Sequence, residues 1–297
     1  MISFMNINRL KINPDDWAYF SEGNRNVIFK YTGNDSFFVN YSEKYDKLLI
    51  FKDKQSFENK KDAPSPPLFH EPFDRYLLAI EPIALENILL EMFNIHLTQN
   101  NKRKKKCENT LLDMNETHAI LLRDLSSSDF PKSTIEFKPK WLIQSILAPD
   151  GWKSCRTCAL RRFRGDLTTN GIRYCPLDLA SGNKARIEKS VRAILIENHI
   201  YNKNIETNLS LYFQQSRLID HLKYLQTSSP RALSMTFCDC TIYVIFLHEE
   251  VFDIKILDLD LKPETKVEYW NKTEEQLING NWYLGRGMVD NEEPCKL

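Results

Sequence analysis

The chain has 297 residues, of which 42% are hydrophobic and 27% are charged, a composition typical of a globular protein with a large core. Its 40 basic and 40 acidic residues cancel, which argues against a protein that coats nucleic acid over its whole surface. The sequence contains no run of about 18 apolar residues, so we expect no membrane span.

The beginning of the chain and its cysteines indicate a location inside the cell. The first residues, MISFMNINRLKINPDD, lack the charged-then-apolar order of a signal peptide. The chain has seven cysteines, an odd number without regular spacing, which favours reduced thiols over a disulfide framework.

The first part of the chain has mainly strand patterns. Residues 17–31 hold two apolar runs around the polar segment SEGNRN, which predicts two strands joined by a turn at Gly23. Residues 47–54, KLLIFKDK, predict a third strand, and residues 118–125, HAILLRDL, predict another that leads into a serine-rich connector. Apolar residues recur with helical spacing from Phe73 to Phe93.

A basic segment, NKRKKKCEN at residues 101–109, lies between these elements. We expect it to be a solvated surface loop in preference to a nucleic-acid contact. A nuclear-import signal at Lys102 to Lys106 is the second interpretation.

The segment TIEFKPKWL, residues 134–142, alternates apolar and charged side chains as a half-buried strand does. Pro139 cannot donate to a ladder, so the strand should lie at a sheet edge or end there. Lys138 and Lys140 share the polar face. Residues 131–189 hold twelve Lys or Arg against five acids, a local charge of +7 that favours a compact anionic partner. The alternative is that Lys138 and Lys140 are simply solvated by water, as most lysines are.

The middle of the chain is expected to be helical and its end to return to strands. Ser181 can cap a helix with apolar positions at Ile187, Val191 and Ile194, and a second amphipathic helix is expected from about Glu206 to Leu225. Strands are expected from Arg231 onward, before a last helix that begins near Glu264. This order predicts an α+β fold with an N-terminal lobe at residues 1–125 and a C-terminal lobe at residues 126–297.

Two aspartates lie near the expected late strands. Asp239 is set in an apolar neighbourhood just ahead of the strongest strand pattern, and Asp258 follows two core-facing isoleucines. A carboxylate there needs a cation, and Mg²⁺ is a candidate, but a strand-end aspartate that reaches solvent is an equal alternative. One aspartate that orients a hydroxyl and one that holds a metal would suit phosphoryl transfer.

Three cysteines, Cys155, Cys158 and Cys175, raise the alternative of a zinc site. A structural zinc site needs a fourth ligand, usually in a second close pair, and none is visible. We therefore expect simple buried thiols.

Several segments together resemble the inositol-pentakisphosphate 2-kinase family in its short fungal form: FSEGNRNVIFKY, EFKPKW, CRTCALRRFR, YCPLDLASGNK, MTFCDC and ILDLDLKPETKVEYW. The resemblance implies a two-lobed inositol polyphosphate kinase fold, distantly similar to protein kinases. It also implies transfer of the γ-phosphate of ATP, with Mg²⁺, to the 2-hydroxyl of inositol 1,3,4,5,6-pentakisphosphate, which gives inositol hexakisphosphate.

The resemblance implies a role for each matching residue. Asp239 matches the family's catalytic aspartate and Asp258 its magnesium ligand. The implied nucleotide-binding residues are Gly23, Asn26, Arg123, Asp124, Glu136 and Lys138. The implied inositide-binding residues are Lys140, Arg156, Arg164, Lys262 and Lys266.

Two other classes of function remain as alternatives. A catalytically silent inositol-polyphosphate-binding scaffold is favoured by departures from the family pattern at Ser21 and Ile50, but it has no use for two aspartates beside a polyanion. An RNA-binding protein would use the basic segments but leaves the aspartates unexplained. We expect a monomer that binds ATP and inositol pentakisphosphate, without membrane or direct nucleic-acid contact, in the nucleus and, as a second location, the cytoplasm.

Overall fold

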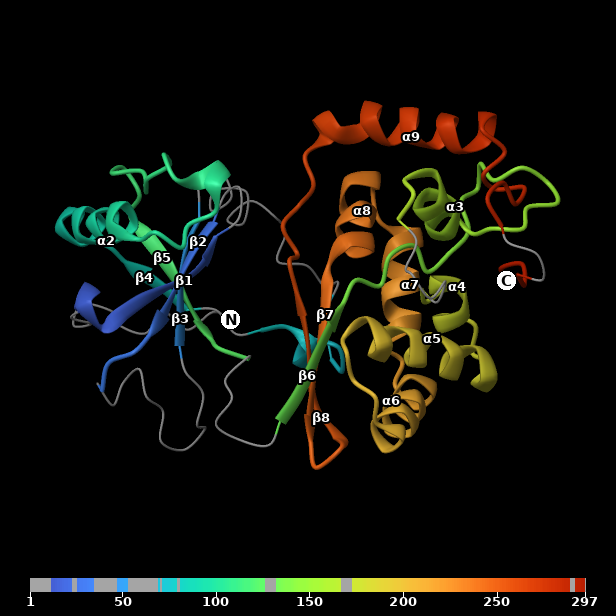
Figure 1. Ribbon diagram of the computed structural model, residues 1–297, viewed down its shortest axis with the longest axis horizontal. Coiled ribbons are helices and arrows are strands. Elements are labelled where there is room, and N and C mark those ends of the chain that lie inside the picture. Colours follow the sequence, from blue (N-terminus) through green and yellow to red (C-terminus); the bar gives the residue numbers. More distant parts are fainter. Residues whose placement is uncertain are drawn as a thin grey trace. The chain divides into compact units, whose positions relative to one another are not determined.

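The computed structural model describes residues 12–22, 26–34, 47–52, 69, 71–78, 81–125, 132–166, 173–288 and 292–296. The chain divides into two compact units (Figure 1), the first made of Met1–Pro67 and Leu78–Phe130 and the second of Leu68–Leu77 and Pro131–Leu297. The second unit therefore takes a short segment from early in the chain, where Leu77 forms a β-bridge with Ile256. Both units combine helices with sheets, so the α+β class is confirmed.

The first unit contains a five-stranded sheet in the order β1-β2-β3-β5-β4. Its neighbouring strands pair antiparallel, and helix α2 packs against the sheet through a core in which the rings of Phe29 and Phe93 lie 4.6 Å apart. The elements of this unit are η1 Pro14–Asp16, β1 Trp17–Glu22, β2 Asn26–Tyr31, β3 Lys47–Lys52, β4 Glu81–Ala84, α2 Asn87–Gln99, η4 Lys105–Cys107 and β5 His118–Arg123.

The expected strands of the first unit are confirmed, but the helical interpretation of Phe73 to Phe93 is wrong in its first part. Residues 74–76 form the 3-10 turn η3 Asp74–Tyr76, and β4 precedes the helix, which begins only at Asn87. Pro82 explains this, because a proline inside a helix removes a hydrogen bond, whereas an outer strand such as β4 tolerates it.

The second unit contains a three-stranded antiparallel sheet in the order β6-β7-β8, formed by β6 Lys132–Phe137, β7 Thr241–Leu247 and β8 Glu250–Leu257. The prediction of an edge strand around Ile135 is confirmed, because β6 is the outer strand and ends two residues before Pro139. The sheet packs against helices through Ile135, Val244 and Ile254, all nearly inaccessible to solvent.

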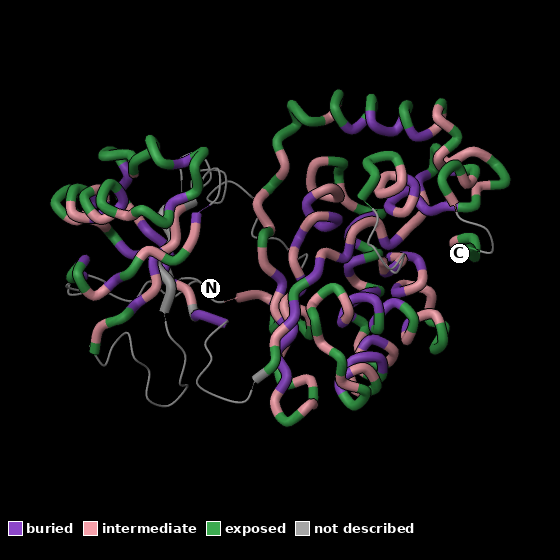
Figure 2. Tube along the Cα trace, in the orientation of Figure 1, coloured by how far each residue is buried: buried purple, intermediate pink, exposed green. Residues whose placement is uncertain are grey.

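Seven helices lie in the described part of the second unit: α3 Arg156–Phe163, α4 Pro176–Leu179, α5 Lys184–Glu197, α6 Lys203–Gln215, α7 Leu218–Ser228, α8 Arg231–Asp239 and α9 Val267–Asn279, the last preceded by η5 Glu264–Lys266. Helix α9 runs along the top of this unit in Figure 2, with its buried residues on the side that faces the rest of the unit. None of the helices that the structure describes, in either unit, is long and apolar enough to cross a membrane.

Three helix predictions need correction. The cap of α5 is Asn183, whose side chain accepts from the Arg186 amide, and not Ser181. The single helix expected from about Glu206 to Leu225 is two helices, α6 and α7, with a break at residues 216–217. The segment 231–239 is a helix and not a strand, because alanine, leucine and methionine favour a helix and the β-branched run starts only at Thr241.

Candidate functional site

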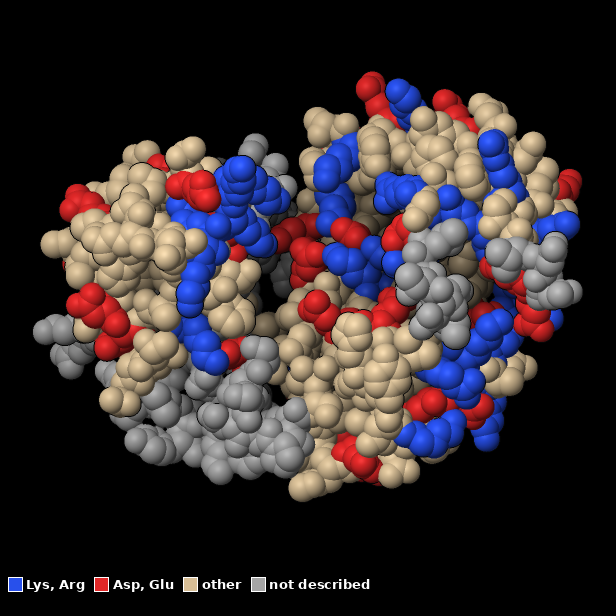
Figure 3. Space-filling view, in the orientation of Figure 1, with Lys and Arg blue, Asp and Glu red and all other residues tan. Residues whose placement is uncertain are grey.

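Strand pairing brings the candidate residues to one end of the three-stranded sheet. Phe137 at the end of β6 pairs with Ile242, and Leu257 at the end of β8 pairs with Thr241. Residues that follow β6, precede β7 and follow β8 must therefore lie together. These are Lys138 and Lys140, Asp239 at the end of α8, and Asp258, and Figure 3 shows acidic and basic side chains adjoining one another on the visible face of this unit.

Three lysines converge on the carboxylate of Asp239. The Nζ atoms of Lys138 and Lys140 lie 3.4 Å and 3.2 Å from its Oδ1, and Nζ of Lys262 lies 2.9 Å from its Oδ2. Lys138 also donates to the main-chain oxygen of Asp239 at 2.6 Å and to Oδ2 of Asp258 at 3.0 Å. The three ammonium groups and two carboxylates leave one net positive charge, which suits an anionic ligand.

The charges of this cluster shift the pKa values of its members. Half-burial by itself raises the pKa of Asp239, but the hydrogen bond from Lys262 and the charges of Lys140 and Lys138 outweigh it and lower the pKa to about 2. Burial also opposes the charge of Lys138, yet its contacts with Asp258 and Asp239 raise its pKa. Burial lowers the pKa of Lys140, and Asp239 offsets this only in part. Asp239 is therefore a fully ionised anion at neutral pH.

The backbone is held in an uncommon conformation at two of these positions. Lys140 has φ 57° and Asp258 has φ 61°, in the left-handed region that residues other than glycine rarely adopt. Such strain persists only where the surrounding structure imposes it, and it is frequent at functional sites.

A buried glutamine that the sequence interpretation missed imposes the turn at Lys140. Gln226, on α7 and 3% exposed, accepts from the Leu142 amide at 2.9 Å and donates to the Lys140 oxygen at 2.8 Å. The same amide group lies 3.4 Å from the Phe237 oxygen near the end of α8. A signal existed, since Gln226 continues the apolar helical row of Leu218 and Leu222 with a polar side chain.

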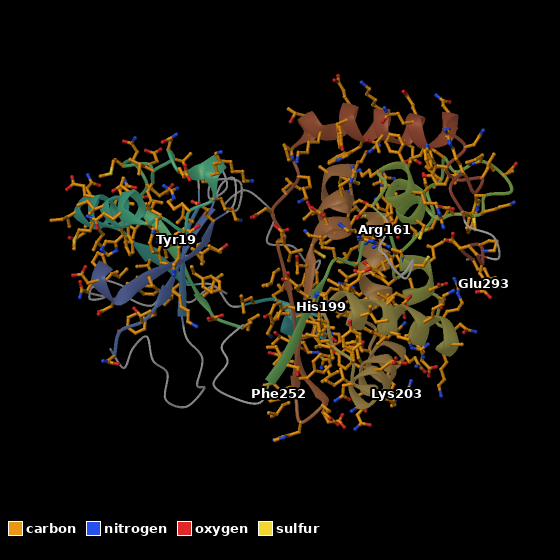
Figure 4. All side chains as sticks on the ribbon, viewed as in Figure 1. Tyr19, Arg161, His199, Lys203, Phe252 and Glu293 are labelled. Carbon is orange, nitrogen blue, oxygen red and sulfur yellow. The ribbon has the colours of Figure 1, made fainter. Side chains whose placement is uncertain are left out.

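Tyr174 supports Lys138 from the other side and was also missed. Its hydroxyl donates to the main-chain oxygen of Lys138, and its ring lies beneath the guanidinium of Arg161 at 5.0 Å. Arg161, which Figure 4 labels near α3, donates in turn to the main-chain oxygen of Tyr174 at 2.6 Å. Burial raises the pKa of the Tyr174 hydroxyl, so it stays a neutral donor.

Arg156 occupies a buried ion pair rather than an open surface. It is 5% exposed, its Nε donates to Oε2 of Glu274 at 2.8 Å, and its guanidinium lies 4.4 Å from the Trp141 ring centre. Glu274 also accepts from the hydroxyls of Ser145 and Tyr283. The inositide contact of Arg156 remains a prediction, and such a contact would compete with the pairing between Arg156 and Glu274.

The other candidate residues of the second unit are more accessible. Arg164 is exposed and donates to the Tyr269 hydroxyl at 2.9 Å, and Lys266 is exposed in η5. Glu136 is exposed on β6, where its amide donates to Asn198 at 3.0 Å. No contact shown by the described residues joins these three to the lysine cluster.

The candidate nucleotide residues of the first unit are only partly described. Gly23 lies outside the described residues. Asn26 begins β2 and Arg123 ends β5, and only their backbones are described. Asp124 is buried and its Oδ2 lies 3.1 Å from Nζ of Lys30. Their nucleotide roles remain predictions.

The basic segment 101–109 is not simply a solvated loop, which corrects the sequence interpretation. Arg103 is 6% exposed and its Nη2 lies 2.8 Å from Oε2 of Glu22 in β1, while the Lys104 amide donates to Oε1 of the same carboxylate at 2.8 Å. Lys102 and Lys105 are exposed. Arg103 therefore stabilises the first unit through a buried ion pair, whereas Lys102 and Lys105 face solvent.

The expectation of simple buried thiols is also incomplete. Cys295 joins Cys155, Cys158 and Cys175, and the four Sγ atoms lie within 4.8 Å of one another. The sequence interpretation lacked this fourth ligand because Cys295 is 120 residues from Cys175.

Comparison with known proteins identifies the family. The family model described as inositol-pentakisphosphate 2-kinase matches residues 19–228 and 212–276. The chain belongs to the inositol-pentakisphosphate 2-kinase family. It is 27% identical over 292 residues to the inositol-pentakisphosphate 2-kinase of Yarrowia lipolytica, covering 91% of this chain and 93% of the relative. Its identity to the enzyme of that name from Saccharomyces cerevisiae is 26% over 281 residues, 86% of this chain and 94% of the relative.

A third relative matches a shorter stretch. The inositol-pentakisphosphate 2-kinase of Eremothecium gossypii is 29% identical over 160 residues, 48% of this chain and 53% of the relative. The resemblance inferred from the short motifs is confirmed, and the protein is a kinase, and hence a transferase, of inositol phosphate metabolism.

Proposed function

We propose that this kinase transfers the γ-phosphate of ATP to the 2-hydroxyl of inositol 1,3,4,5,6-pentakisphosphate and so produces inositol hexakisphosphate. The names of its relatives support the substrate and the position of transfer. The observation that carries the proposal is the convergence of Lys138, Lys140 and Lys262 on Asp239, with Asp258 beside Lys138. Phosphoryl transfer needs little more from a protein than positioning and charge neutralisation, which this cluster supplies.

Asp239 is proposed to receive the 2-hydroxyl. With a pKa of about 2 it is a weak base, so in the arrangement described it would orient the hydroxyl more effectively than deprotonate it. Phosphate groups that draw the three lysines away would raise its pKa, since those lysines are what lower it. Substrate binding would thereby make Asp239 a stronger acceptor of the hydroxyl proton.

The three lysines are proposed to exchange Asp239 for phosphate oxygens. Lys138 would contact the phosphates of the nucleotide, and Lys140 and Lys262 would contact those of the inositide. An ammonium group between a carboxylate and a phosphate keeps a partner in both states, so no cation loses its partner when substrate leaves.

Asp258 is proposed to hold the Mg²⁺ that accompanies ATP. Its carboxylate is 45% exposed and offers the hard oxygen donors that this ion prefers, so the residues present fit the ion. Mg²⁺ would neutralise charge on the transferred phosphoryl group. Gly23, Asn26, Arg123, Asp124 and Glu136 complete the proposed nucleotide contacts, within a two-lobed architecture distantly similar to protein kinases.

Arg164, Lys266 and Arg156 complete the proposed inositide contacts. Arg164 and Lys266 are exposed cations and can reach a ligand directly. Arg156 would need to keep or exchange its pairing with Glu274. We further propose a monomer that acts in the nucleus, with the cytoplasm as a second location, and that binds no nucleic acid directly.

Transfer of labelled phosphate from Mg-ATP to inositol 1,3,4,5,6-pentakisphosphate tests the proposal. The unaltered chain should give a product that co-migrates with inositol hexakisphosphate, and Asp239→Asn should reduce turnover at least about 1000-fold while inositide still binds. Asp220→Asn, an exposed carboxylate on α7, is the matched control and should retain activity. Inositide binding without transfer by the unaltered chain would favour the silent scaffold instead.

A further inference from the structure

Four cysteine side chains from three separate parts of the second unit converge at one point. Cys155 precedes α3, Cys158 lies in its first turn, Cys175 precedes α4, and Cys295 comes from residues 292–296. All four are free thiols, and their Sγ atoms lie within 4.8 Å of one another. Nothing in the proposed phosphoryl transfer uses them.

The sulfur separations match those around a single metal ion. Sγ of Cys175 lies 3.8 Å from Sγ of Cys155 and 3.7 Å from Sγ of Cys295. A disulfide would bring two sulfurs to about 2.05 Å. Four thiolates at about 2.3 Å from a zinc ion, at the corners of a tetrahedron, are about 3.8 Å apart.

Hydrogen bonds with the main chain hold three of the four cysteines in position. The Cys158 amide donates to Sγ of Cys155 at 3.4 Å, a contact that stabilises a thiolate in a Cys-x-x-Cys turn. The Cys295 amide donates to the Lys153 oxygen at 2.8 Å, which holds the fourth ligand beside the first pair. The Ser190 hydroxyl donates to the Cys175 oxygen at 3.1 Å and fixes the third.

We propose that Cys155, Cys158, Cys175 and Cys295 bind one Zn²⁺ as a structural site. Four sulfur ligands within 4.8 Å of one another, two pairs of them at tetrahedral spacing, favour zinc among the common divalent ions. Four protein ligands leave no position for substrate or water. An iron–sulfur cluster would hold the thiolates farther apart, because several iron atoms would lie among them.

The ion would fasten residues 292–296 to the helices that support the lysine cluster. Cys175 directly follows Tyr174, which holds the main chain of Lys138, and Cys158 shares α3 with Arg161, which stacks on Tyr174. Arg186 of α5 also donates to the Lys296 oxygen at 2.5 Å, and Lys189 of α5 pairs with Glu293, which Figure 4 labels. The site would thus stabilise the second unit and position Lys138 indirectly.

The metal content of the full chain, purified under reducing conditions, tests this site. Elemental mass spectrometry should find one zinc per chain. Cys295→Ser and Cys158→Ser should each lower zinc retention at least about tenfold after dialysis against a chelator. Cys107→Ser and Cys240→Ser, two buried cysteines outside the cluster, are matched controls and should retain the ion.

Two further measurements decide the outcome if a cysteine variant fails to fold. Replacing zinc with Co²⁺ in the unaltered chain should give the visible absorption bands of a tetrahedral thiolate site. Chelation should lower the Tm of the unaltered chain, and added Zn²⁺ should restore it. A folded chain that binds no metal, one that binds iron instead, or one that oxidises to a Cys175–Cys295 disulfide with unchanged Tm would overturn the proposal, whatever the result of the kinase assay.

Discussion

Gln226 donates to the main-chain oxygen of Lys140 across 2.8 Å, from a position that is 3% exposed. This bond joins α7 to the turn that carries a cation of the candidate site. The turn is strained, since Lys140 has φ 57°, and the same glutamine also satisfies the Leu142 amide. The position of Lys140, a proposed phosphate contact, therefore depends on a buried side-chain amide on another helix.

Replacing this glutamine should loosen the turn without removing any charge. We expect Gln226→Leu to destabilise the protein by about 1–3 kcal/mol, because it leaves a buried donor and a buried acceptor without partners. The KM for inositide should rise more than kcat falls. Urea denaturation and steady-state kinetics measure both effects. Gln215→Leu, at the exposed end of α6, is the control, and an unchanged KM for Gln226→Leu would show that the turn does not depend on the amide.

Lys140→Met keeps most of the stem and removes the charge. We expect the KM for inositol pentakisphosphate to rise about 10- to 100-fold, which corresponds to the loss of one charge-assisted hydrogen bond. The KM for ATP should change little. Lys223→Met, an exposed lysine of α7, is the control. Ordinary saturation by inositide in the Lys140 variant would exclude this residue from the binding site.

The low pKa of Asp239 predicts a pH-dependent contribution to stability. An ordinary aspartate has a pKa of 3.8, whereas that of Asp239 is about 2, so its ion pairs stabilise the folded state above about pH 4 and are lost as the pH falls toward 2. We expect at most about 1 kcal/mol, because solvent screens a carboxylate that is 40% exposed. The free energies of unfolding of the unaltered chain and Asp239→Asn, compared at pH 7, 4 and 3, should converge with acid. A gap that widens toward pH 3 would contradict the assignment.

The buried pair of Arg156 and Glu274 allows structural and ligand-binding roles to be separated. Breaking it from either side leaves one buried charge without its ionic partner, so Arg156→Met and Glu274→Gln should each cost about 3–5 kcal/mol of stability. If Arg156 also binds inositide, only its own substitution should weaken binding in calorimetry at a temperature where both variants are folded. Equal loss of binding in both would assign Arg156 to structure alone.

Nuclear entry through the basic segment can be tested without unfolding the first unit. Lys102 and Lys105 are exposed, whereas Arg103 is paired with Glu22. We expect Lys102→Ala with Lys105→Ala to reduce nuclear accumulation and to leave Tm unchanged, as followed by fluorescence microscopy and thermal unfolding. Arg103→Ala, as a contrast, should lower Tm because it leaves the buried carboxylate of Glu22 without its ionic partner. Normal nuclear accumulation of the double variant would reject the signal.

Local patterns in the sequence predicted the parts of this molecule that depend on neighbours in the chain. Alternation and Pro139 correctly indicated an edge strand at β6, and Asp239 was correctly placed just ahead of a strong strand, β7. The region of α8 was misread, because a short apolar run has no period long enough to distinguish a helix from a strand.

The contacts that complete the site depend on residues far apart in the chain. Gln226 lies 86 residues from Lys140, and Cys295 lies 120 residues from Cys175. Which residues meet across such distances is decided by tertiary packing, and neither composition nor spacing contains that information. Arg103 was misread for the same reason, since its partner lies 81 residues away.

The left-handed backbone of Lys140 and Asp258 has a consequence for protein engineering. A side chain in this conformation costs about 1–3 kcal/mol, and glycine or asparagine would relieve much of that cost. A library selected only for heat resistance should therefore accumulate Gly or Asn at positions 140 and 258. Such selection would enrich chains that survive heating and have lost a cation and a carboxylate of the proposed site, so thermostability and turnover should evolve in opposite directions here.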